Sequence, residues 1–190
     1  MSMSDTPRPR RRNPEERRRT IVEAAAALIL EVGSAGLTHR LVAHRAEVPL
    51  GSTTQYFATL DDLRDAALAH LAHDIDVGLA EVSDTLAEHG PVPAVFARAL
   101  HDYISQDHLI RADMALISAA AVDPKLRPLA VRWSDGMVAL LSPHVGARAA
   151  RAVTAFADGV SMHALLYGTP MDVDDLTTAL AALTEPGDDR

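Results

Sequence analysis

The chain has 190 residues, enough to bury a real hydrophobic core in one compact unit or two small ones. Hydrophobic residues make up 48% of it and aromatic residues only 4%, a composition typical of an Ala- and Leu-rich helical protein. It contains no cysteine, which excludes a disulfide framework and a thiolate metal site. We find no secretory signal and no apolar run long enough for a membrane span, so we expect a cytoplasmic protein without a membrane partner.

The net charge of −8 is unevenly distributed along the chain. Residues 1–57 hold nine arginines against six acidic residues, whereas the remainder holds nine basic residues against 20 acidic ones. A basic end on an acidic body suits a protein that docks one end on nucleic-acid phosphates. The alternative is that the N-terminal arginines are only solvated.

Residues 1–13 place prolines among arginines, and this composition predicts a disordered Arg-rich tail. Such a tail could reach DNA phosphates or a minor groove.

From Pro14 onward the pattern predicts only helices, about nine in total, and therefore an all-α protein. Asn13 suits the N-cap of the first helix, which Gly33 and Gly36 end. Thr38 caps a second, short helix, and a turn at Val48–Gly51 leads to a third over Ser52–Phe57. Thr59 and Asp62 predict a capping box that starts a long helix reaching about His89. The remaining helices are expected at Pro93–Gln106, His108–Val122, Lys125–Ser142, Ala147–Tyr167 and Asp172–Thr184, with Pro143 as one of the breaks.

The third helix carries five consecutive side chains that can form hydrogen bonds, from Ser52 to Tyr56. A helix too short to bury much surface, but rich in polar tips, suits a DNA major groove, with Phe57 packing it back onto the protein. The alternative is an ordinary polar helix at a surface corner.

Several residues of this region stand at the spacing of a known DNA-binding unit, namely Thr38, Val42-Ala43, Ala46, Val48, Gly51-Ser52, Tyr56-Phe57 and Leu63. The whole chain resembles the TetR family of transcriptional regulators. The resemblance implies a three-helix, helix-turn-helix DNA-binding domain over residues 14–58 and an effector-binding and dimerisation domain over residues 59–190. It further implies a repressor, without cofactor or catalytic residues, that leaves a palindromic operator when a small, largely apolar effector binds. The expected DNA-binding residues are Thr38, Arg40, Arg45, Gly51, Ser52, Thr53, Thr54, Gln55 and Tyr56.

Three positions depart from the family pattern. Glu47 stands where the turn glycine is usual, so either this position has no positive φ or the chain bears the strain. Thr54 replaces an aromatic residue that usually touches phosphate, and Leu60 replaces a lysine. We therefore expect Arg40, Arg45, Tyr56 and the tail to supply more of the electrostatic attraction to DNA.

Scarce aromatic and methionine side chains mark a possible effector pocket, with plain core packing as the alternative. The candidates are Phe96, Tyr103, Met114, Ile117, Trp133 and Met137. Effector binding is expected to tilt the long helix after Thr59 and so change the separation of the recognition helices.

Two apolar stripes on the last two helices fit a homodimer interface, or alternatively the core of a single chain. The interface residues expected are Ala152, Phe156, Gly159, Val160, His163, Leu176 and Leu180.

Two alternatives to this function stay open. His70, His73 and Asp74 could make a metal-sensing regulator, although no third ligand is signalled elsewhere and catalysis has no matching motif. The departures from the family pattern also allow a helical interaction protein that has lost DNA binding.

Overall fold

A computed structural model describes residues 13–185, which form helices and connecting turns without a strand. The helices are α1 (Pro14–Gly36), α2 (His39–Arg45), α3 (Leu50–Tyr56), α4 (Leu60–His89), α5 (Pro93–Ile104), α6 (Asp107–Val122), the 3₁₀ turn η1 (Pro124–Leu126), α7 (Arg127–Ala130), α8 (Arg132–Val145), α9 (Ala147–Tyr167) and α10 (Val173–Thr184). The all-α prediction is confirmed. The expected disorder of residues 1–13 falls, except for Asn13, outside the described residues.

Side-chain caps start the helices where the sequence predicts them. The Asn13 side chain accepts from the Glu15 N–H at 3.2 Å, and the Thr38 hydroxyl accepts from the Leu41 N–H at 3.2 Å. At α4 the capping box is complete, because Thr59 and Asp62 each accept from the other's backbone N–H at 3.0 Å. These bonds satisfy donors that a helix start would otherwise leave unpaired.

The single helix predicted over Lys125–Ser142 is wrong, because the segment is divided into η1, α7 and α8. Pro124 and Pro128 each lack a donor, and the Asp123 carboxylate accepts from the Lys125 N–H at 3.1 Å, which favours a tight turn there. The break predicted at Pro143 is also wrong. Pro143 lies inside α8, near its end, and the helix ends only at Gly146, whose φ is +83°.

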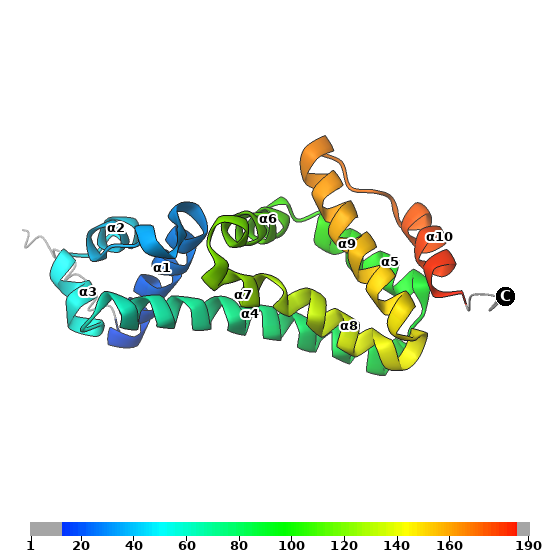
Figure 1. The fold of residues 1–190 in the computed structure, drawn as a ribbon, viewed down its shortest axis with the longest axis horizontal. Coiled ribbons are helices and arrows are strands. Elements are labelled where there is room, and N and C mark those ends of the chain that lie inside the picture. The colour runs from blue at the N-terminus through cyan, green and yellow to red at the C-terminus, as the bar shows by residue number, and fades with distance from the viewer. Residues whose placement is uncertain (1–12, 186–190) are drawn as a thin grey trace, which may run out of the picture.

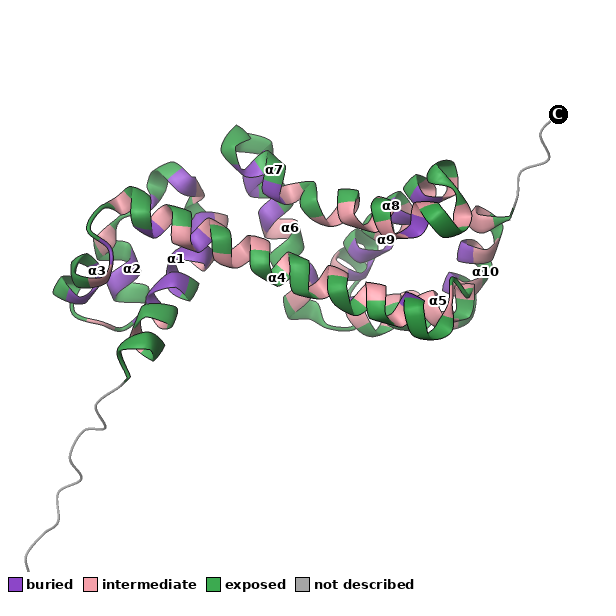
Figure 2. Ribbon diagram, turned by 90° about the horizontal axis from the view of Figure 1, so that it is seen from below, coloured by how far each residue is buried: buried purple, intermediate pink, exposed green. Residues whose placement is uncertain are grey.

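Helix α4, at about 1.5 Å per residue, runs along the molecule and joins the α1–α3 unit at one end to α5, α9 and α10 at the other (Figure 1). Buried side chains gather at the two ends and are sparse along the middle of α4 (Figure 2). They form two clusters, which we call the first core and the second core.

The first core joins the α1–α3 unit to two helices of the rest of the chain. Besides residues of α1 and α2 it contains Phe57, Leu63 and Ala67, and from the α6–η1 region Ala119, Ala120 and Leu126. The second core holds Leu86 of α4 together with buried residues of α5, α6, α8, α9 and α10. The end of α6 is therefore packed into the same core as the helix-turn-helix.

Candidate DNA-binding surface and effector region

The turn between α2 and α3 is held by backbone hydrogen bonds and one strained residue. The Ala46 N–H donates to the Val42 carbonyl at 2.8 Å, and the Val48 N–H donates to the Ala43 carbonyl at 3.0 Å. Glu47 has a φ of +51°, the left-handed region in which glycine is favoured. Of the two outcomes expected at this position, the chain therefore adopts the positive φ and bears its strain, about 1–2 kcal/mol for a residue with a Cβ.

Helix α3 has an inner and an outer face, which corrects the prediction that all five polar residues are presented to DNA. Thr53 is fully buried and its hydroxyl donates to the Leu50 carbonyl at 2.8 Å, while Ser52 is only 8% exposed. Thr54 and Gln55 are exposed, together with Gly51 at the start of the helix. The helical repeat of 3.6 residues prevents five consecutive side chains from sharing one face.

Two aromatic residues fix the end of α3 onto the body. Tyr56 is half-buried against the first core, and Phe57 belongs to that core with only 4% of its surface exposed. The role of Phe57 as an anchor is thus confirmed. With this end fixed, the outer residues Gly51, Thr54 and Gln55 are held at the surface by packing on the other side of the helix.

The arginines of this unit differ in how their charge is used. Arg40 is exposed, whereas Arg45 makes a bidentate pair with Glu31 of α1, with Nη1–Oε1 at 2.8 Å and Nη2–Oε2 at 2.6 Å. The hydrogen bonds from Arg45 lower the pKa of the Glu31 carboxyl, and Glu31 raises the pKa of Arg45. Of the two arginines expected to contact DNA phosphates, Arg45 is therefore already paired with a carboxylate of the protein itself.

Sequence reasoning missed Arg18 on α1. Its guanidinium carbon lies 5.0 Å from the centroid of the Phe57 ring, a cation–π contact at the end of α3. The basic run at the start of α1 signalled a positive charge here, but only the fold brings it beside the recognition helix.

Four polar side chains, one each from α5, α6, α8 and α9, form a second group of interest. The Tyr103 hydroxyl donates to the Asp113 carboxylate, and the Ser134 hydroxyl donates to the Asp158 carboxylate at 3.4 Å. Asp113 and Asp158 are both exposed at the surface, yet partial desolvation by the neighbouring helices raises the pKa of each carboxyl, and the negative charge of Asp113 raises that of Asp158 further. Desolvation, followed by the bond to Asp113, also raises the pKa of Tyr103. We call this group the acidic pair and its hydroxyl partners; the sequence predicted only Tyr103 among its members.

The predicted lining residues differ in burial and in what they pack against. Trp133 and Met114 are half-buried, and among the described residues they pack into neither core. The Trp133 ring packs close to α4 at Gly78, where a Cβ would lie 3.0 Å from its Cζ3 atom. Tyr103 and Met137 pack against the second core. Ile117 is 47% exposed on α6, so its assignment to the wall of an enclosed pocket is wrong for this conformation.

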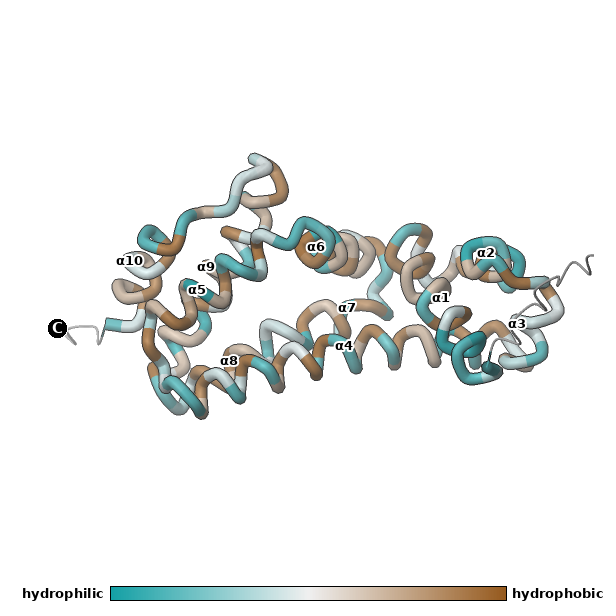
Figure 3. Tube along the Cα trace, turned by 180° about the vertical axis from the view of Figure 1, so that it is seen from behind, coloured by the Kyte–Doolittle hydropathy of each residue, from teal (hydrophilic) through white to brown (hydrophobic). Residues whose placement is uncertain are grey.

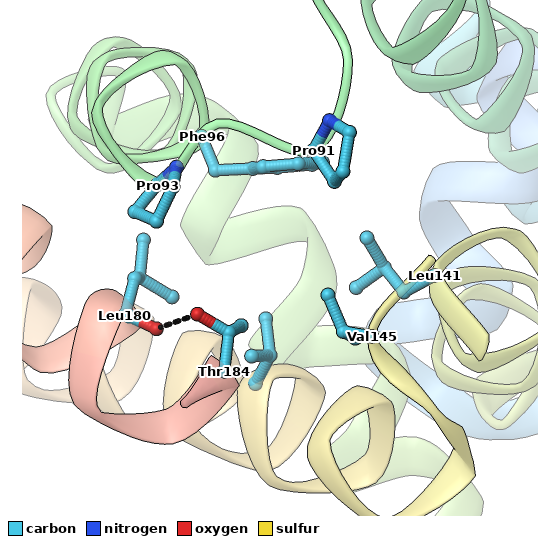
Figure 4. A pocket seen from close by; sticks show the side chains of 8 residues that line it. Pro91, Pro93, Phe96, Leu141, Val145, Leu180 and Thr184 are labelled. Atoms are coloured by element: carbon cyan, nitrogen blue, oxygen red, sulfur yellow. Dashed lines mark hydrogen bonds between the residues drawn. The ribbon is translucent and has the colours of Figure 1, made fainter. Parts of the chain in front are cut away.

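Phe96 lines a different space, a small apolar cavity of about 20 Å³ (Figure 4). The other walls are Pro91, Pro93, Leu141, Val145, Val153, Leu180 and Thr184. The Thr184 hydroxyl donates to the Leu180 carbonyl at 2.9 Å instead of pointing into the space. A cavity of this volume has room for about one water molecule, too little for an organic effector.

The expected interface residues divide between the inside and the outside of the chain. Val160, Leu176 and Leu180 are 4%, 0% and 3% exposed in the second core, so their prediction as partner contacts is wrong for this fold. Ala152, Phe156 and Gly159 are half-buried, and His163 is exposed. Along the same outer side of α9, Met162 is 44%, Leu166 71% and Tyr167 75% exposed, a set of apolar residues that sequence reasoning missed.

The metal-sensing alternative finds no support. His70 Nε2 lies 3.5 Å from a carboxylate oxygen of Asp74 in an i,i+4 pair. Within residues 13–185, no three His, Asp or Glu side chains come together as metal ligands.

Over the same residues no helix is both long and apolar enough to span a membrane, and polar and apolar segments alternate along α4 and α8 (Figure 3).

Comparison with known proteins gives consistent results. Residues 90–186 match the family described as "Tetracyclin repressor-like, C-terminal domain". The HTH-type transcriptional regulator BetI of Burkholderia thailandensis is 27% identical over 168 residues, which cover 83% of this chain and 86% of BetI. The multidrug binding protein EbrR, solved with malachite green, is 36% identical with a TM-score of 0.73, over 90% of this chain and 99% of EbrR. EbrR has also been solved with proflavin and with ethidium. A TetR-family member from Streptomyces coelicolor A3 is 36% identical with a TM-score of 0.72, again over 90% and 99% of the two chains.

Proposed function

Since the chain belongs to the TetR family of ligand-responsive, DNA-binding transcriptional regulators, we propose that it is a cytoplasmic repressor. It binds a palindromic operator as a homodimer and is released when a small molecule binds between its two cores. The two expected domains have different roles: residues 14–58 bind DNA, and residues 59–190 bind the effector and the second subunit.

The observation that carries the DNA-binding part is the two-faced third helix. Thr53 and Phe57 fix α3 from inside, which leaves Gly51, Thr54 and Gln55 outward. Gln55 is the best candidate for reading a base, because an amide can pair with adenine through two hydrogen bonds in the major groove. Thr38 and Arg40 at the start of α2, together with Arg18, supply contacts to the backbone phosphates.

The outer side of α9 supports a dimer. Met162, Leu166 and Tyr167 expose apolar surface, and at Gly159 a Cβ would meet no atom within 4 Å, which leaves room for a partner helix to approach. A two-fold pair places two copies of α3 in successive major grooves about 34 Å apart.

The acidic pair and its hydroxyl partners narrow the effector to an organic cation with an aromatic or otherwise apolar body. Partial desolvation, and for Asp158 also the nearby charge of Asp113, raises the pKa of these two carboxyls, and a bound positive charge would stabilise their ionised forms. Trp133 and Tyr103 add aromatic faces that attract cations. Malachite green, proflavin and ethidium, with which EbrR has been solved, are aromatic cations.

The test is selection of bound fragments from genomic DNA, followed by titration with dyes. Recovery of a palindrome that Gln55→Ala no longer protects would support the proposed DNA contact. Ethidium and proflavin should then release the wild type from this palindrome, and Asp158→Asn should need a higher dye concentration. Recovery of no specific fragment, or release of Asp158→Asn at the wild-type concentration, would contradict the corresponding half of the proposal.

A further inference from the structure

One contact joins the end of α6 directly to the DNA-binding unit. The Asp123 carboxylate, at the C-cap of α6, accepts from both the hydroxyl and the backbone N–H of Ser34 in α1, the latter at 3.3 Å. On the other side the Ser34 carbonyl accepts from Arg64 Nε of α4 at 3.0 Å. Ser34 is only 4% exposed, so α1, α4 and α6 meet at one buried serine.

Ser34 lies where the backbone of α1 changes direction. Gly33, with φ +75° and ψ +164°, interrupts the helix, and only one further turn precedes Leu37 and the cap residue of α2, Thr38. Leu37 is 1% exposed in the first core. Any displacement of Ser34 is therefore passed along four residues to the start of α2, which packs on α3.

Helix α6 is the element that reaches both regions. Asp113 in its middle accepts from Tyr103 in the proposed effector region, and Asp123 at its end holds Ser34. Ten residues of helix separate them, about 15 Å. Ala119 and Ala120, in the last turn of α6, are packed in the first core beside α1. Because α6 is a continuous helix whose end is hydrogen-bonded to Ser34, a shift or rotation of α6 would displace Ser34 as well.

We propose that Asp123, acting through Ser34, is a positioning residue that couples α6 to the recognition helix by a route separate from tilting of α4. This inference rests on the proposed function, since it concerns how effector and operator binding influence each other. Because such coupling is reciprocal, operator binding at α3 should also stabilise the α6–η1 junction, even when no effector is present.

The experiment measures amide hydrogen exchange over residues 119–126, with and without a duplex that the wild type selects from random-sequence DNA. Full-length wild type, Asp123→Ala, Asp123→Asn and Ser34→Ala are compared. Asp107→Ala is the matched control, because Asp107 lies on the same helix and binds Arg111 Nε at 2.6 Å away from the first core. Circular dichroism identifies any variant that does not fold, and the conservative Asp123→Asn and Ser34→Ala then carry the test.

In the wild type, operator binding should slow exchange at these amides by about fivefold or more, the lower end of usual allosteric couplings. Asp123→Ala and Ser34→Ala should bind the duplex but lose most of this protection. A double variant that combines Asp123→Ala with Ser34→Ala should lose no more than either single one. Asp107→Ala should behave as wild type. Unchanged protection in folded Asp123 and Ser34 variants would overturn the inference and leave the proposed function intact. Failure of the wild type to select any duplex would instead overturn the proposed function.

Discussion

Arg45 and Glu31 form two parallel hydrogen bonds, of 2.8 and 2.6 Å, between the second and the first helix of the DNA-binding unit. The pair aligns α2 against α1 and at the same time removes a positive charge from the set available to phosphates. Electrostatic attraction to DNA is therefore weaker here than a count of arginines indicates.

Replacing Glu31 with Gln should free Arg45 and strengthen DNA binding. Each additional phosphate contact steepens the fall of log affinity with log salt by about 0.9. Fluorescence anisotropy over a salt series measures this slope. Glu88→Gln is the control, because it makes the same change of net charge at the far end of α4. Equal slopes for the two variants would show that Arg45 does not reach the backbone.

Gln55→Ala and Thr53→Val should separate the two faces of α3. Loss of the exposed amide should reduce specific affinity by about 1–3 kcal/mol, the value of one bidentate base contact, and leave the melting temperature unchanged. Thr53→Val removes only an internal hydrogen bond, so it should alter stability by less than about 1.5 kcal/mol and preserve the footprint. Footprinting and thermal unfolding of both variants check this. A lost footprint in folded Thr53→Val would contradict the inward orientation.

Glu47→Gly should stabilise the turn between α2 and α3. Glycine avoids about 1–2 kcal/mol of left-handed strain but costs about 0.5–1 kcal/mol of chain entropy, so the net gain is at most about 1.5 kcal/mol. It should also raise DNA affinity by removing a negative charge beside the phosphates. Glu47→Gln provides the comparison, since it keeps the strain and removes the charge. A stability gain as large in Glu47→Gln would assign the effect to charge instead of φ.

The pKa values of Asp113 and Asp158 predict a pH effect of definite sign. Both are raised on folding, so the folded protein binds more protons than the unfolded chain, and stability falls as pH rises from the ordinary carboxyl range through the raised values. Asp158→Asn removes this cost. Its melting temperature should exceed that of the wild type at neutral pH, and the difference should shrink below about pH 4, the ordinary aspartate value. Asp84→Asn, on α4 and outside this polar group, should show no such trend; the same pH dependence there would refute the assignment.

Leu166→Lys should break the proposed homodimer. Leu166 is 71% exposed on α9, so a lysine there leaves a single chain undisturbed but places a charge in an apolar interface. Sedimentation velocity should give a monomer with wild-type helix content. Val131→Lys, at a 49% exposed apolar residue near α7, should remain dimeric. If Leu166→Lys remained dimeric, the interface would have to lie on another surface of the protein.

The sequence by itself determined most of the helices, the caps of the first, second and fourth, and the family. Caps such as Asn13, Thr38 and Thr59 act within three residues, and the helical repeat of apolar residues is local, so both can be read from the chain. Only the tertiary structure decided which face of a helix is covered. Thr53, Leu176 and Leu180 were assigned outward contacts although the fold buries them, because burial depends on helices distant in sequence. For the same reason the pairs Arg45–Glu31, Tyr103–Asp113 and Ser34–Asp123 could not be predicted: their partners are 14, 10 and 89 residues apart, and only packing brings them together.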